Sequence, residues 1–137
     1  EDRGDRPVFA YIHYLDAHWP YNRKLPRHRG VFGDGAMSSP APPSGSKVRA
    51  WVGAGVSDDD LRILEARYDQ EVAFADVAIG GVIDLLRRHG LWQETLLVVT
   101  SDHGEAFLEH GVLQHSTDPF DELVRIPLVM RLPPSWA

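Results

Sequence analysis

The most informative segment of the sequence is Val98-Val99-Thr100-Ser101-Asp102-His103-Gly104, which Glu105 follows directly. Its apolar start is typical of a buried strand, which gives way to small polar residues, a carboxylate, an imidazole and a glycine. Two side chains that can bind a metal ion therefore stand at the end of this strand, where α/β enzymes commonly keep their functional groups. We interpret the stretch as part of an active site in an α/β protein.

The composition of the chain excludes several other classes of protein. Its 137 residues correspond to about one domain, and an apolar content of 43% is enough for a sizeable core. The net charge of −6 argues against a nucleic-acid-binding protein, which would show a clustered basic face. The absence of cysteine excludes disulfides and thiolate zinc sites. No run reaches the ~18 apolar residues of a transmembrane helix, so no membrane segment is predicted.

Three apolar runs predict strands. They cover residues 8–12, 95–100 and 126–132, and the first two lack the polar alternation of a strand that is exposed on one face. A helical pattern separates the first run from the second. Strand, helix and strand in this order predict a βαβ crossover and a largely parallel sheet.

The predicted helix has clear signals at both ends. Ser57 is a good N-cap residue, and Gly90 is a good C-terminal stop. Between residues 61 and 86 apolar residues recur every three or four positions, which is typical of an amphipathic helix. Gly80-Gly81 inside it indicate close packing or a bend, because glycine otherwise weakens a helix.

A long loop is predicted at about residues 22–56. Glycine, proline and serine recur throughout this range. Long loops in a compact domain are commonly lids, binding loops or disordered segments, so we expect this one to be flexible.

Asp102 and His103 are the candidate metal ligands. On an extended strand, neighbouring side chains point to opposite sides, so both can face one ion only if the backbone turns. Gly104 permits such a turn. A divalent ion held there could act as a Lewis acid on a sulfuryl or phosphoryl oxygen.

Four motifs in order resemble the sulfatase branch of the alkaline phosphatase superfamily. They extend from residue 7 to about residue 132, and one departure is Ala17, where the family often has proline. The motifs are Asp16-Ala17-His18-Trp19-Pro20-Tyr21, a helix with Tyr68, Glu71 and Asp76, Ser101-Asp102-His103-Gly104-Glu105, and His110-Gly111 with Phe120-Asp121-Glu122-Leu123-Val124-Arg125-Ile126-Pro127-Leu128.

The resemblance implies a fold and roles for four residues. It implies a partial three-layer αβα sandwich, with residues 1–137 as the later part of one catalytic domain. Asp102 and His103 would bind a divalent metal ion. His18 and His115 would contact the sulfate or phosphate group of a small anionic ester. If the strands after which they lie are neighbours, these four residues should converge on one cleft.

The resemblance also implies a cofactor set that this chain does not complete. The ion would be Ca²⁺, or Mn²⁺, Mg²⁺ or Zn²⁺ in a relative that acts on phosphate esters. The family nucleophile is a formylglycine made within Cys/Ser-x-Pro-x-Arg, and Ser38-Ser39-Pro40 lacks the arginine. We therefore expect the nucleophile upstream and this chain alone to be inactive. The family would place the protein in the periplasm, outside the cell or at a membrane anchor.

Three other functions stay open. One is a phosphoesterase or phospho-group transferase on the same fold, since sulfate and phosphate esters differ more in charge than in shape. Another is a noncatalytic member that has kept the fold for binding or structure. The third is a zinc hydrolase built from His18, His103, His110 and His115, but their spacing matches no helical zinc motif.

Overall fold

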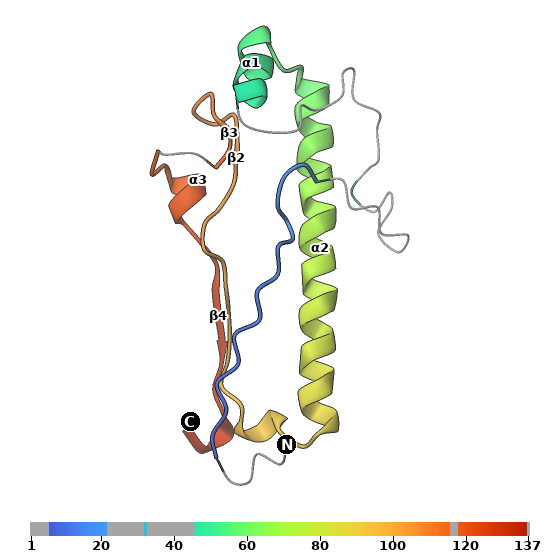
Figure 1. Cartoon of the computed structure of the whole chain (residues 1–137), viewed down its shortest axis with the longest axis vertical. Coiled ribbons are helices and arrows are strands. Elements are labelled where there is room, and N and C mark those ends of the chain that lie inside the picture. Colours follow the sequence, from blue (N-terminus) through green and yellow to red (C-terminus); the bar gives the residue numbers. More distant parts are fainter. Residues whose placement is uncertain (1–5, 22–31, 33–45, 116–117, 137) are drawn as a thin grey trace.

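The computed structural model describes residues 6–21, 32, 46–115 and 118–136. In Figure 1 a long helix lines one side and a narrow pair of strands lines the other. In chain order the elements are α1 (Ser46–Ala54), α2 (Asp58–Arg88), the 3-10 helix η1 (Trp92–Glu94), β1 (Leu97–Thr100), β2 (Ala106–Phe107), β3 (Leu113–Gln114), α3 (Asp121–Val124), β4 (Leu128–Arg131) and the 3-10 helix η2 (Pro134–Trp136). None of the helices described here combines the length and apolarity needed to cross a membrane.

The predicted long helix is confirmed with both of its ends. The Ser57 hydroxyl oxygen accepts a hydrogen bond from the Asp60 amide at 3.1 Å, and Asp58, Asp59 and Asp60 occupy the first turn. These carboxylates suit the positive end of the helix dipole. Beyond the last turn Gly90 has a φ of 68°, a conformation that suits glycine.

The paired glycines of α2 do not pack closely. A Cβ atom at Gly80 or Gly81 would meet no other described atom within 4 Å, and the helix runs through both without a break. Of the two predicted alternatives, close packing is not found among the described residues. The apolar face of α2 is packed mainly near Leu64, whereas Val77 and Leu85 farther along are exposed.

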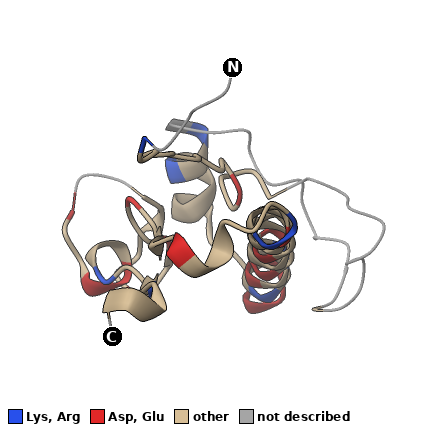
Figure 2. Ribbon diagram, turned by 90° about the horizontal axis from the view of Figure 1, so that it is seen from below, with Lys and Arg blue, Asp and Glu red and all other residues tan. Residues whose placement is uncertain are grey.

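Both signs of charge lie along α2, which Figure 2 shows nearly end-on. Arg62 pairs with Asp59 at 2.8 Å and Arg87 pairs with Asp84 at 3.3 Å, and all four side chains are exposed. Such pairs contribute about 0.3–0.5 kcal/mol each. The helix therefore depends more on its cap and on the packing of its first turns.

The predicted parallel sheet is not confirmed. β1 and β4 pair antiparallel, with Leu97 opposite Arg131 and Thr100 opposite Leu128, and β2 and β3 form a second antiparallel pair. The long helix α2 precedes β1, so it cannot connect β1 to β4 or β2 to β3 as the crossover of a parallel pair. Strands were predicted at 95–100 and 126–132, where β1 and β4 lie, but the parallel direction predicted for the sheet does not hold for this pair.

The first predicted strand does not form a ladder. Residues 8–12 carry no strand assignment, and Phe9 is 90% exposed. In Figure 1 the segment of residues 6–21 runs lengthwise between the strand pair and α2, and the Tyr14 hydroxyl donates to the Ala78 carbonyl at 3.5 Å. The prediction of a strand buried on both faces is therefore wrong for this run, which is exposed and pairs with none of the described strands.

The predicted loop at residues 22–56 is partly helical. α1 occupies Ser46–Ala54, where Val48 is buried. Residues 22–31 and 33–45 lie outside the described residues. The prediction is therefore wrong for the last part of the range, where an apolar spacing favoured a helix over the surrounding glycines.

The packed core lies at one end of the molecule. It brings together α1, the first turns of α2, the β2–β3 pair and the chain just after His18. The buried members are Trp19, Tyr21, Val48, Leu64 and Leu113, and Trp51, Val52, Leu61, Tyr68, Phe107 and Leu108 pack against them. We call this part the core end, and we call β1, β4, η1 and η2 the sheet end.

Candidate active site

The candidate ligands stand on a tight turn directly after β1. The Ser101 hydroxyl donates to the carbonyl oxygen of His103 at 2.5 Å, and Asp102 Oδ1 accepts from the His103 amide at 3.0 Å. These local bonds bend the chain where the strand ladder stops. The bend lets the adjacent carboxylate and imidazole approach each other, as the sequence predicted.

Gly104 is required for a different reason from the one expected. A Cβ atom there would lie 2.0 Å from the carbonyl oxygen of Glu122, and the Gly104 amide donates to the Leu123 carbonyl at 2.8 Å. Glycine therefore lets the backbone of the ligand turn touch the backbone of α3. The contact ties the two candidate ligands to that helix.

Asp102 and His103 form an exposed pair. Nε2 of His103 lies 3.8 Å from Oδ1 of Asp102, and 75% of the Asp102 side chain is exposed. Slight burial alone would raise the pKa of Asp102, but backbone hydrogen bonds and the nearby His103 and His13 outweigh it and lower that pKa. The carboxylate is therefore ionised and suited to bind a cation.

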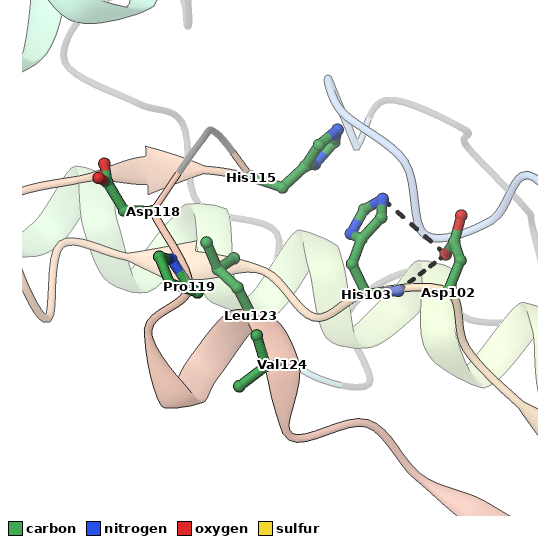
Figure 3. Close-up of a pocket in the computed structure, with 7 residues that line it drawn as sticks. All are labelled: Asp102, His103, His115, Asp118, Pro119, Leu123 and Val124. Carbon is green, nitrogen blue, oxygen red and sulfur yellow. Dashed lines mark hydrogen bonds and ion pairs between the residues drawn. The ribbon is translucent and has the colours of Figure 1, made fainter.

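Two further histidines, His115 and His18, lie beside this pair, and the three imidazole rings form a row. The ring centroids of His103 and His115 are 4.1 Å apart, and those of His18 and His115 are 5.5 Å apart. Figure 3 shows His115 next to His103, with Asp102 on the far side of His103. His18, His103 and His115 come from three separate segments of the chain. His103 follows β1, His115 follows β3, and His18 precedes all of the described helices and strands.

The three histidines share one hydrogen-bonding pattern. Nδ1 lies 2.8 Å from the Trp19 carbonyl oxygen in His18, 2.7 Å from the Gly104 carbonyl oxygen in His103, and 3.1 Å from Glu105 Oε1 in His115. Carbonyl and carboxylate oxygens only accept, so each Nδ1 carries the proton and donates it. Each Nε2 is thereby left to bind a metal ion through its lone pair or, when it is protonated, to donate to an anion.

An open cleft of about 410 Å³ lies beside these residues. Asp102, His103 and His115 form one side, and the chain around α3 forms the other, as Figure 3 shows. That second side consists of Asp118, Pro119, Leu123 and Val124. His18 does not line the cleft itself but contacts His115 edge-on.

Two further residues complete the arrangement and had no predicted role. Oε1 of Glu105 accepts from His115, and Oε2 accepts from the Tyr21 hydroxyl at 2.5 Å. Both residues belong to motifs that the sequence displayed, one directly after Gly104 and the other directly after Pro20. Their places in those motifs were the available signal, but spacing alone does not bring residues 21, 105 and 115 together.

His110 lies outside the histidine group. Its Nδ1 donates to Oε1 of Glu122 at 2.7 Å, and its ring stacks on Phe120 with centroids 4.0 Å apart. Through this hydrogen bond and this ring contact, His110 connects the loop between β2 and β3 to α3 and to the residue just before it. The alternative four-histidine zinc site is not assembled, because one of its members is engaged elsewhere.

The fit of a metal ion can be judged from the donor atoms. Asp102 supplies carboxylate oxygens and the adjacent His103 supplies Nε2, and these are donor atoms that suit a divalent cation. In the parts of the chain that the structure describes, no three His, Asp or Glu side chains are grouped so that they could hold a metal ion. The pair thus fits one side of a metal site that needs further ligands.

Comparisons with known proteins indicate the family of the chain. The family model described as Sulfatase matches residues 1–137. PehA, a multifunctional alkaline phosphatase superfamily protein of Trinickia caryophylli, is 33% identical over 82 residues, 58% of this chain and 15% of that protein. Iduronate 2-sulfatase of Mus musculus is 32% identical over 78 residues, 57% of this chain and 14% of the enzyme.

A longer alignment covers nearly the whole chain. YidJ, an uncharacterized sulfatase of Escherichia coli (strain K12), is 27% identical over 141 aligned positions, 96% of this chain and 28% of that protein. The chain thus spans between 14% and 28% of the lengths of these three relatives.

Proposed function

This chain belongs to the sulfatase family, and on that premise we propose that the protein containing it hydrolyses sulfate esters. Membership of the family also implies an α/β fold of the alkaline phosphatase type. One observation carries the proposal. His18, His103 and His115 converge beside an open cleft, and each has Nδ1 already bonded and Nε2 available.

His18 and His115 would bind the ester group. An imidazole that holds its Nδ1 proton on a fixed acceptor can bind an anionic oxygen once Nε2 also carries a proton, since both ring nitrogens then donate. The fixed acceptors are the Trp19 carbonyl for His18 and Glu105 for His115. The two rings would therefore meet the ester in set orientations, which lowers the cost of organising them.

Asp102 and His103 would hold a divalent ion, which we propose to be Ca²⁺ in a sulfatase. Such an ion, when bound, polarises an ester oxygen and stabilises developing negative charge. The hydrogen bond from Nδ1 of His103 to the Gly104 carbonyl orients the imidazole for this task. We propose that the remaining ligands and a formylglycine nucleophile come from parts of the protein outside this chain.

Phosphate ester hydrolysis is the second candidate. PehA is named a multifunctional member of the alkaline phosphatase superfamily and is 33% identical to this chain. The same pair of ligands and the same histidines could serve a phosphate ester, with Mn²⁺, Mg²⁺ or Zn²⁺ as the ion.

The test is hydrolysis of chromogenic esters by the complete protein that contains this chain. We expect turnover of 4-nitrophenyl sulfate above that of 4-nitrophenyl phosphate. His115→Ala or His18→Ala should lower kcat by about 10²- to 10³-fold, the usual effect of removing one transition-state donor. His89→Ala is the matched control, because His89 caps the far end of α2.

The other outcomes separate the alternatives. Preferred turnover of the phosphate ester would replace the first candidate with the second. Absence of turnover with both esters, in a folded protein supplied with Ca²⁺, would indicate a noncatalytic member of the family.

A further inference from the structure

The least exposed carboxylate of the site is not one of the candidate metal ligands. Only 5% of the Glu105 side chain is exposed, whereas its partner His115 lies at the cleft with 34% of its side chain exposed. Burying a carboxylate is costly unless hydrogen bonds satisfy it. Glu105 has two such bonds, and they come from two different segments of the chain.

One bond comes from the core. The Tyr21 hydroxyl donates to Oε2 of Glu105 at 2.5 Å. Burial, together with the neighbouring Glu105 carboxylate, raises the pKa of Tyr21, so this hydroxyl remains a donor. The Tyr21 ring is itself held edge-on against Tyr68, with centroids 5.5 Å apart, and packs beside Phe107.

The other bond reaches the cleft. Nδ1 of His115 donates to Oε1 of Glu105 at 3.1 Å. Because one carboxylate accepts from both, the orientation of the His115 ring is linked to the position of a tyrosine in the packed core. The partner of one ring nitrogen determines which tautomer a histidine adopts.

We propose that Glu105 is a positioning residue for His115. It holds the ring with the proton of Nδ1 on its carboxylate, so that Nε2 faces the ester and donates to its oxygen once Nε2 is also protonated, and Tyr21 holds Glu105 in place. The inference rests on the proposed function, since it concerns the histidine that would bind the ester. The carboxylate acts through His115 and does not itself touch the substrate.

Two variants separate this role from a merely structural one. Tyr21→Phe removes one donor to Glu105 but keeps the bond to His115. Tyr21→Phe combined with Glu105→Leu also removes the acceptor of His115, and it leaves no buried hydroxyl unsatisfied. Replacing both partners of a buried hydrogen bond by apolar groups of similar shape is close to neutral for stability.

The first measurement needs no activity. In the complete protein labelled with ¹⁵N-histidine, long-range ¹H–¹⁵N spectra report which nitrogen of neutral His115 carries the proton. We expect the Nδ1–H tautomer in the wild type and in Tyr21→Phe, and a shift toward Nε2–H in the double variant. An Nε2–H tautomer in the wild type, or no change in the double variant, would overturn the proposal.

The second measurement is turnover with whichever ester the wild type hydrolyses. Relative to Tyr21→Phe, the double variant should lose about 10- to 100-fold in kcat, the scale of losing an orienting partner. The loss should vanish in a His115→Ala background, because the effect acts through that ring. A loss of equal size in that background would also overturn the proposal. Glu65→Gln on the exposed face of α2 is the control for a removed charge.

The two proposals fail in different ways. A wild type that hydrolyses neither ester refutes the proposed function, and the tautomer spectra still decide the role of Glu105. An active enzyme whose His115 tautomer ignores Glu105 refutes the positioning role and leaves the proposed function in place.

Discussion

The core end and the sheet end use apolar residues in opposite ways. At the core end Leu64 is completely buried among aromatic rings, whereas at the sheet end Leu128 is 64% exposed and Val129 and Met130 in the same strand are also exposed. In this chain, packing is therefore concentrated next to the candidate site.

This difference in burial indicates that the core end supports the cleft. Tyr21 belongs to the core and also bonds Glu105, so the rigid packing of the core end extends directly into the histidine group. β1 reaches the site only through the turn that follows Thr100. We expect substitutions at the two ends to differ accordingly.

The largest expected contrast is between two leucines. In the complete protein Leu64→Ala should lower the free energy of unfolding by about 2–5 kcal/mol, because it leaves a cavity in the core. Leu128→Ala should lower it by less, since that side chain is already mostly exposed. Urea denaturation measures both. Equal losses would show that the strand face is covered elsewhere in the protein.

The next contrast is between two glycines, whose replacement by alanine should change the stability in opposite directions. Gly104→Ala should destabilise by about 1–3 kcal/mol, because its Cβ would collide with the backbone of α3. Gly81→Ala should stabilise by about 0.5–1 kcal/mol, because the position is helical, exposed and open. Thermal unfolding of the complete protein gives both signs. A harmless Gly104→Ala would contradict the close contact.

A smaller effect is expected at the cap of α2. Ser57→Ala should cost about 1 kcal/mol, because it leaves the Asp60 amide without its side-chain acceptor. Ser57→Asp should recover most of that loss, since a carboxylate oxygen can accept the same bond. Denaturant midpoints of the three proteins provide the measurement, and an aspartate that fails to rescue would indicate another role for the serine.

The smallest effect depends on pH. The hydrogen bond with His110 lowers the pKa of Glu122 below its usual value of 4.5. The unfolded chain then binds this proton more readily, so the stabilisation is complete above that value and disappears as the pH falls through the lowered pKa. The free energy of unfolding of the wild type should exceed that of Glu122→Gln at about pH 6, and this excess should decrease as the pH is lowered to about 3. If the difference between the two proteins stays constant across that pH range, the hydrogen bond between His110 and Glu122 does not stabilise the fold in this way.

Features that depend on local sequence could be predicted from the sequence. The long helix followed from Ser57, Gly90 and the apolar spacing between them, and all three act within a few turns of chain. The gathering of His18 with His115 and the ligand pair required the family resemblance, because no local rule brings residues so far apart together.

The errors also have physical causes. The direction of β4 depends on which strand it pairs with, and an apolar run carries no information about its partner. α1 was missed because glycines surround it, although the spacing of Val48, Trp51 and Val52 fits a helix that packs on the core. Glu105 was overlooked because its importance comes from Tyr21, which is distant in sequence.

The contact between Gly104 and α3 limits how the cleft can change its size. The backbone of the ligand turn already touches the carbonyl oxygen of Glu122, so α3 cannot move inward without displacing Asp102 and His103. It cannot move outward without breaking the bond between the Gly104 amide and the Leu123 carbonyl. A change in the size of the cleft must therefore come from replacing the side chains of Leu123 and Val124, with the helix left where it is.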